Sequence, residues 1–268
     1  MVRCFGLALI CGSLGLTGCQ FFNSTASTSA SSPCAAARET QANAVELYMA
    51  FVERPLGDPF LNKNGPEPES CLWNCTDAHV VDFERQIQLE ENGYRVGQIV
   101  GIVPSRLMTL LRSERACVNP RYRLVPCGEP TLLHLGPVLP RSSFQVKMGG
   151  QSEQVTLEQA QFALEIVAKL TNDGRTELKI TPTAEHRRTA FAVEPSPDLV
   201  GYVPQTSRPQ RRFSQLGWNV SLRPGETLVI GANLDKPGSL GQRSFTQEEG
   251  AEPVQRVLIL RTSRPLEE

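Results

Sequence analysis

Apolar residues occupy alternate positions at the start of the first segment with a clear folding pattern. This period of two is typical of a strand, because successive side chains of a strand point to opposite faces. We therefore expect a strand from about residue 44, ended by the turn formers Pro55, Gly57 and Pro59. The apolar positions of this strand are Val45, Leu47, Met49 and Phe51.

A capped helix is predicted to follow. Thr76 or Asp77 can accept hydrogen bonds from its first turn, and Gly93 suits its C-terminal end. Residues 94–103 are rich in Val and Ile and predict a second strand, after which Pro104 starts a short helix. The long connection would allow the two strands to pair in parallel. The apolar positions are Val80, Phe83 and Ile87 in the first helix and Leu107, Leu110 and Leu111 in the second.

The pattern changes near residue 121, where short apolar runs begin to alternate with Gly and Pro. Short apolar runs separated by Gly and Pro are typical of antiparallel β structure. The clearest hairpin joins Gln161–Leu170 to Arg175–Thr183 through the turn Asn172-Asp173-Gly174. Further strands are predicted at 218–222, 227–230 and 256–261.

These patterns together predict an α+β fold. A small strand-helix-strand-helix unit would occupy residues 44–118, and a larger antiparallel β-rich domain would occupy residues 119–268.

The N-terminal segment has the pattern of an export signal. Arg3 precedes an apolar run, Phe5–Leu16, that is shorter than the ~20 residues of a membrane-spanning helix. The run ends in Leu16-Thr17-Gly18-Cys19, which resembles the lipobox of bacterial lipoproteins. This resemblance implies that residues 1–18 are removed as a signal peptide and that Cys19 carries fatty acyl chains. Residues 19–43, rich in Ser and Thr, would form a flexible tether.

Charge gives no sign of a nucleic-acid partner. The chain has 27 cationic and 28 anionic residues, and loss of the leader with Arg3 would leave 26 and 28. Because the two signs are interspersed, no basic surface suited to phosphate backbones is expected.

Cysteine usage is informative if the chain is exported, because an oxidising compartment favours disulfides. Six of the eight cysteines would remain after cleavage. Cys34, at the end of the tether, would be a free thiol or would pair between chains. The three possible pairings of the other four stay open. The disulfide candidates are Cys71, Cys75, Cys117 and Cys127.

A zinc or redox site is the alternative for part of this set. Cys71, Cys75 and His79 recur every four residues and would line one face of a helix. No fourth ligand is evident, so no metal and no cofactor are predicted. Asp77 lies two residues from His79 and would diverge from it on a helix.

Catalytic signatures are not recognisable. No nucleophile elbow, Walker loop or dinucleotide fingerprint occurs, and no catalytic residue is predicted. His134 lies in an apolar strand, where a half-buried or surface position is expected. Acids such as Asp198 or Glu248 leave open an exported hydrolase acting on cell wall or polysaccharide.

The C-terminal half is similar to the β core of secretins, the outer-membrane ring proteins of secretion and pilus systems. The similar stretches are the Phe162–Thr181 hairpin with "LKITPTAEH", "RPGETLVIGA" over 223–232, and the terminal "RVLILRTSRP". Ala232 stands where the secretin pattern has a second glycine. The resemblance implies a secretin-related or secretin-accessory subunit as a further alternative.

The leading interpretation is a non-enzymatic, lipid-anchored envelope protein with a structural, assembly or partner-binding role. Its expected partners are the membrane, through the lipid anchor, and envelope proteins, with the oligomeric state left open. Gln20 after the modified cysteine slightly favours the outer membrane, with the body facing the periplasm or the outside.

Overall fold

The computed structural model describes residues 44–62, 71–187, 193–195, 202–204, 208–247 and 252–262. The predicted signal peptide, the lipidation site Cys19, Cys34 and the tether lie outside these residues, and so do Asp198 and Glu248.

The first sheet places strands from the two ends of the described chain side by side. Its order is β2–β12–β14–β1–β3, each neighbouring pair is antiparallel, and β13 adds to β14. Leu47 lies opposite Thr262, and Pro55 lies opposite Val254. The strands are β1 (Ala44–Pro55), β2 (Tyr94–Ile99), β3 (Cys117–Pro126), β12 (Thr227–Ala232), β13 (Thr246–Gln247) and β14 (Val254–Thr262).

The central strands β12 and β14 are buried on both faces. In β12, Leu228 and Ile230 belong to one apolar cluster, whereas Val229 between them belongs to a second cluster. Strands covered on both sides need continuous apolar runs rather than alternation, and both of these strands have such runs. The corresponding residues of β14 are Leu258 and Leu260 in the first cluster and Val257 and Ile259 in the second.

The second sheet is organised by β6, a strand of 20 residues. Residues 151–160 of β6 pair with β5, and residues 161–170 pair with β4 on one side and β7 on the other. Strands β11 and β10 then pair with successive parts of β7. The strands are β4 (Pro130–His134), β5 (Leu139–Met148), β6 (Gln151–Leu170), β7 (Thr176–Glu185), β10 (Gln210–Arg212) and β11 (Trp218–Leu222).

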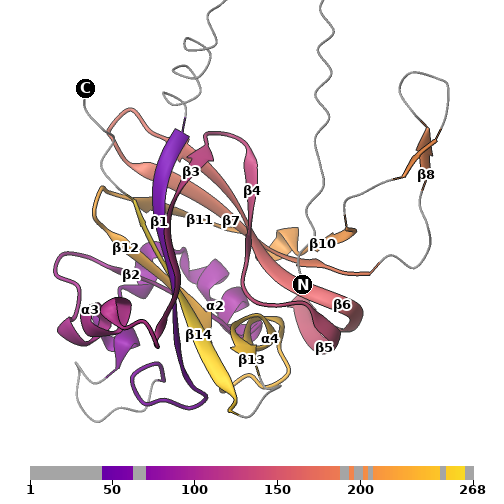
Figure 1. Ribbon diagram of the computed structural model, residues 1–268, viewed down its shortest axis with the longest axis horizontal. Coiled ribbons are helices and arrows are strands. Elements are labelled where there is room, and N and C mark those ends of the chain that lie inside the picture. Colours follow the sequence, from indigo (N-terminus) through magenta and orange to yellow (C-terminus); the bar gives the residue numbers. More distant parts are fainter. Residues whose placement is uncertain are drawn as a thin grey trace, which may run out of the picture.

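The main core lies between the two sheets (Figure 1). Leu47 of β1 and Leu164 of β6 are both fully buried in it. The short helices α2 (Phe83–Glu91) and α4 (Leu240–Phe245) close one end of this core through Leu89 and Phe245. The β5–β6 hairpin packs against these two helices, and the side-chain amide of Asn92 bonds the backbone of Lys147 in both directions, at 2.7 and 2.8 Å.

A thinner layer covers the other face of the first sheet. Helix α3 (Ser105–Arg112) buries Leu107 there, beside the 3-10 helix Leu72–Cys75. A second 3-10 helix, Ala78–Val80, follows it, and a third, Ser214–Leu216, precedes β11.

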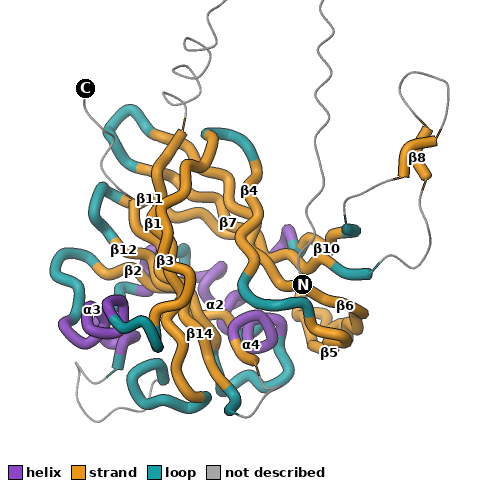
Figure 2. The backbone as a smooth tube through the Cα atoms, viewed as in Figure 1, coloured by secondary structure: helices purple, strands orange, loops and turns teal. Residues whose placement is uncertain are grey.

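The predicted α+β class is wrong, because the described residues are mostly β. Strands account for 54% of them and helices for 18%, and the sheets are antiparallel (Figure 2). The parallel pairing that the long connection would have allowed between the first two strands does not occur, since β14 and β12 lie between β1 and β2. The helix predicted after Thr76 begins only at Phe83, where Asp82 caps it. Two of its predicted core residues are exposed, Phe83 by 75% and Ile87 by 43%.

The two predicted domains, residues 44–118 and 119–268, both contribute strands to the first sheet. The boundary expected between residues 118 and 119 falls inside β3, and β12 and β14 complete the sheet between β1 and β2. A separate two-stranded ladder joins β8 (Val193–Pro195) to β9 (Tyr202–Pro204). Among the described residues, no helix has the length and apolar character needed to cross a bilayer.

Candidate functional site

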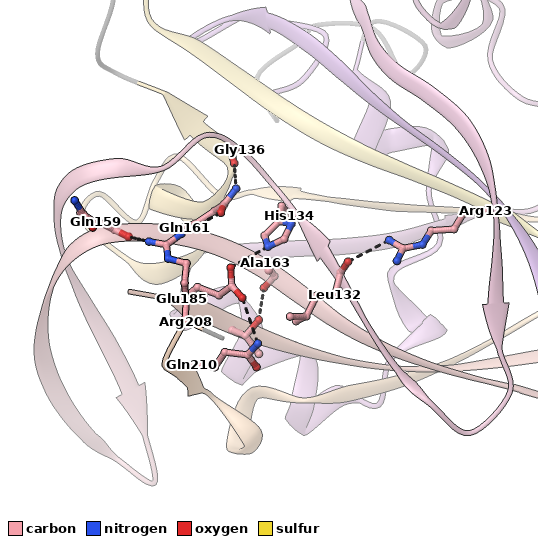
Figure 3. A network of polar contacts seen from close by, with 11 residues as sticks. Arg123, Leu132, His134, Gly136, Gln159, Gln161, Ala163, Glu185, Arg208 and Gln210 are labelled. Carbon is pink, nitrogen blue, oxygen red and sulfur yellow. Dashed lines mark hydrogen bonds and ion pairs between the residues drawn. The ribbon is translucent and has the colours of Figure 1, made fainter. Parts of the chain in front are cut away.

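A network of polar contacts lies on the face of the second sheet that points away from the core (Figure 3). Strand periodicity explains its position. Leu164 and Ile166 of β6 point into the core, so Ala163 and Glu165 between them point outward. On β7, Thr183 pairs with Ala163, so Thr183 and the alternate residues of β7 point outward on the same side of the sheet. We call the polar residues of this face the outer-face network, with members Gln161, Glu165, Thr183, Glu185, His134, Arg208, Gln210 and Arg212.

The His134–Glu185 pair joins β4 to β7 across β6. The ring Nε2 of His134 lies 3.0 Å from Oε2 of Glu185, and Gln210 donates to the other carboxylate oxygen over 3.3 Å. The Glu185 side chain is only 13% exposed, whereas that of His134 is 43% exposed. His134 therefore lies at the surface of a strand, as predicted. Among the described residues, Glu185 is the only hydrogen-bond partner of the His134 side chain, so this contact ties β4 to β7.

Arginines hold β10 and the segment before it onto β6. Arg212 forms an ion pair with Glu165, whose side chain is 12% exposed. Arg208 donates to Oε1 of Gln161 over 3.2 Å and also to the carbonyl of Gln159. The amide of Gln161 in turn donates to the Gly136 carbonyl over 3.1 Å. These contacts satisfy the polar groups of the face and fix the β10 segment against the sheet.

The structure does not support the disulfide prediction. Cys71, Cys75, Cys117 and Cys127 form no disulfide with one another in the part of the chain that the structure describes. Instead, the Cys71 thiol donates to the Asn62 carbonyl over 2.7 Å, and Cys117 is buried in β3. Burial raises the pKa of the Cys117 thiol, which makes this cysteine less nucleophilic.

The alternative zinc or redox site has no helix to support it. Residues 71–80 form two 3-10 helices separated by Thr76 and Asp77, so the spacing of four does not place the side chains on one face. The His79 side chain is 92% exposed, and no metal-binding group of His, Cys, Asp and Glu occurs within the described ranges. Asp77 and His79 do not diverge, since Asp77 caps the 3-10 helix and its Oδ1 lies 3.3 Å from Nδ1 of His79.

The outer edge of the first sheet is a second surface of interest that was not predicted from the sequence. β3 lies at that edge and exposes Tyr122 by 66% and Leu124 by 53% on one face. The Tyr122 ring packs against Tyr48 of β1 at a centroid distance of 5.2 Å. The alternation of Arg121, Tyr122, Arg123 and Leu124 is the signal that could have identified this strand. We call residues 121–124 the β3 edge.

Comparisons with known proteins give a weak structural similarity. No protein-family model matches the chain, and no curated protein matches it. The chain is similar to the secretin-domain β-barrel of InvG from the Salmonella SPI-1 injectisome, with a TM-score of 0.23 and 11% identity over 84% of this chain and 64% of that one. A second InvG structure, a cryo-EM structure of the secretin, gives a TM-score of 0.20 and 13% identity over 84% and 63%. The chain thus spans less than two thirds of these chains. At such TM-scores the similarity carries no inference about fold or function.

Proposed function

We propose that this protein is a non-enzymatic, lipid-anchored envelope protein that binds a protein partner through the β3 edge. The observation that carries this proposal is the exposure of Tyr122 and Leu124 on one face of an edge strand. An edge strand presents unpaired backbone N–H and C=O groups, which an extended segment of another protein can pair with. Apolar side chains beside those groups add affinity and specificity.

Charge selects the kind of partner. Arg121 and Arg123 project from the face of β3 opposite to Tyr122 and Leu124. Arg123 is half-buried and donates to the Leu132 carbonyl of β4 over 3.2 Å, so the exposed Arg121 is the cation that a partner would meet first. Two copies of this strand would bring like charges together, which disfavours pairing between identical chains. The fitting partner is an extended segment with apolar residues on one face and Asp or Glu on the other.

The lipobox supplies the location in this proposal. Acyl chains on Cys19 would hold the protein at a membrane, because each buried methylene contributes ~0.8 kcal/mol and two or three chains bind almost permanently. The membrane would then lie at the Cys19 end of the tether, residues 19–43, and the folded body with its bound partner would lie at the other end.

Two experiments test the two parts separately. A photo-crosslinking amino acid at Leu124 should capture one distinct envelope protein in intact cells, whereas the same group at Glu84, exposed on α2 beside the opposite sheet edge, should not. Equal products from both positions, or none from Leu124, would contradict the binding surface. Labelled palmitate should enter the wild-type chain and not Cys19→Ser, and retention of label in that variant would contradict the anchor.

Electron microscopy separates this proposal from a secretin-related subunit. The partner-binding protein is expected as single copies or small complexes in detergent. Ring-shaped oligomers of the purified chain would favour the secretin-related alternative instead.

A further inference from the structure

A half-buried arginine on the first sheet is stacked on a fixed tryptophan. The guanidinium carbon of Arg95, in β2, lies 4.4 Å from the centroid of the Trp73 ring. Trp73 is 7% exposed, and its indole N–H donates to the Leu61 carbonyl over 2.8 Å. The ring lies over Gly231 of β12, where a Cβ atom would come within 3.0 Å of it. Trp73 is therefore held in place against the first sheet, and the Arg95 guanidinium stacks on its ring.

The side chain of Arg95 makes no hydrogen bond or ion pair with the residues that the structure describes. Burial lowers the pKa of its guanidinium, and the weaker opposing effects come from Cys71, Glu90 and Asp235, none of which forms an ion pair with it. By contrast, Arg256, Arg211 and Arg212 each pair with a carboxylate. A guanidinium has five N–H donors in a planar fork, so partial burial without a partner leaves strong donors unused.

These donors border a small pocket. Its volume is about 70 Å³, and its other walls include Thr76, Gln86, Glu90 and Tyr94. Since about 10–15 Å³ of such volume is enough for one water molecule, the pocket has room for a few waters or for one small polar group. A whole drug-sized ligand needs at least about 300 Å³, so only the end of a larger molecule could enter.

We propose that this pocket binds a carboxylate group, which accepts paired hydrogen bonds from the Arg95 guanidinium. Planar carboxylates match the fork geometry of arginine, and the stacking on Trp73 holds the fork in one plane. Glu90 on the wall disfavours a doubly charged phosphate more strongly than a singly charged carboxylate. The carboxylate belongs either to an acidic side chain of a protein or to a free small acid. This site is independent of the lipid anchor and of the β3 edge.

NMR of the purified full-length chain in detergent tests this site, with the Trp73 indole N–H as the reporter. The probes are sodium acetate, a blocked tripeptide with a central Glu, and sodium chloride at matched ionic strength. Acetate or the peptide should shift the Trp73 indole signal in a saturable way, and chloride should not. Tighter binding of the peptide identifies a protein-borne carboxylate, and equal or tighter binding of acetate identifies a free acid.

Variants of the two charged residues distinguish specific binding from a general salt effect. Arg95→Gln should weaken binding by about tenfold or more, and Arg95→Lys, which keeps the charge but loses the fork, should weaken it less. Glu90→Gln should strengthen binding about threefold or more, because it removes a like charge. Equal shifts with chloride, no shift with either carboxylate, or unchanged affinity in both Arg95 variants would overturn the proposal.

Discussion

The contact between Gly241 and Gly93 gives a test in which two physical effects have opposite signs. Gly241 lies in helix α4, and its N–H donates to the Asn92 carbonyl over 2.8 Å. A Cβ at this position would lie 2.3 Å from both the carbonyl carbon and the oxygen of Gly93, and 2.6 Å from N of Tyr94. These are backbone atoms of the turn between α2 and β2, so no side chain can rotate away.

The two effects can be compared in magnitude for Gly241→Ala. Helix propensity alone predicts a gain of about 1 kcal/mol, because Ala loses less backbone entropy than Gly in a helix. Overpacking against rigid backbone costs about 3 kcal/mol, the upper part of the usual range. The net loss of about 2 kcal/mol in the free energy of unfolding corresponds to a fall of about 4–8 °C in Tm for a domain of this size.

Thermal unfolding followed by circular dichroism measures this change. Thr109→Ala, at an exposed position of helix α3, is the control and should shift Tm by no more than about 2 °C. A rise in Tm for Gly241→Ala, or no change, would mean that helix propensity dominates and that α4 does not lie against the α2–β2 turn as described.

Three further substitutions test the core, an inter-sheet contact and a buried phenol. Leu164→Ala should lower the free energy of unfolding in urea by about 2–5 kcal/mol, since this fully buried side chain leaves a cavity; a loss below 1 kcal/mol would argue against a tightly packed core. Arg256→Ala should lower the free energy of unfolding by about 2–3 kcal/mol, because it removes hydrogen bonds to Glu53 (2.5 Å), the Leu135 carbonyl (3.0 Å) and Gln247 (2.9 Å). Arg175→Ala, which removes an exposed ion pair, should lower it by less than about 1 kcal/mol. Burial raises the pKa of Tyr94, so the folded state retains this proton at pH values where the unfolded chain loses it. Stability should therefore fall as pH rises above about 10, the ordinary pKa of tyrosine, and Tyr94→Phe should reduce that fall; identical alkaline unfolding profiles for variant and wild type would refute the assignment.

Local signals predicted the β6–β7 hairpin and β11 of the second sheet, but not β5, β10 or the first half of β6. The hairpin of β6 and β7 turns at Thr171–Arg175, where the Thr171 N–H donates to the Arg175 carbonyl over 2.9 Å. The predicted strand 218–222 matches β11, with Trp218, Val220 and Leu222 buried as its period of two requires. A turn signal flanked by alternating residues specifies a hairpin without reference to distant parts of the chain.

Long-range arrangements were not predictable from the same patterns. Helical spacing placed Phe83 and Ile87 in the core, yet the residue of α2 that is buried is Leu89, because the position of the neighbouring β5–β6 hairpin decides which face is covered. No local sequence pattern indicates that β12 and β14 lie between β1 and β2 in the sheet.

The candidate sites depend on the same long-range information. Arg95 and Trp73 meet because Gly231, far along the sequence, leaves room for the indole ring. A single sequence contains no local pattern for such a contact. The outer-face network likewise joins β4, β6, β7 and β10, so its members could be identified as polar residues but not as neighbours.

The interleaved first sheet also sets the order in which the molecule can assemble during synthesis. β1 is complete by residue 55, but one of its neighbours in the sheet, β14, ends at residue 262. Because a ribosome synthesises the chain from its N-terminus, the sheet that contains β1 and β2 can be completed only after nearly the whole polypeptide has been made. Closing such long loops is entropically costly and slow. Any chain truncated before β14 leaves Val52 and Leu47 of β1 paired on the β3 side alone and exposes their other edge, which makes incomplete chains natural substrates for chaperones and proteases.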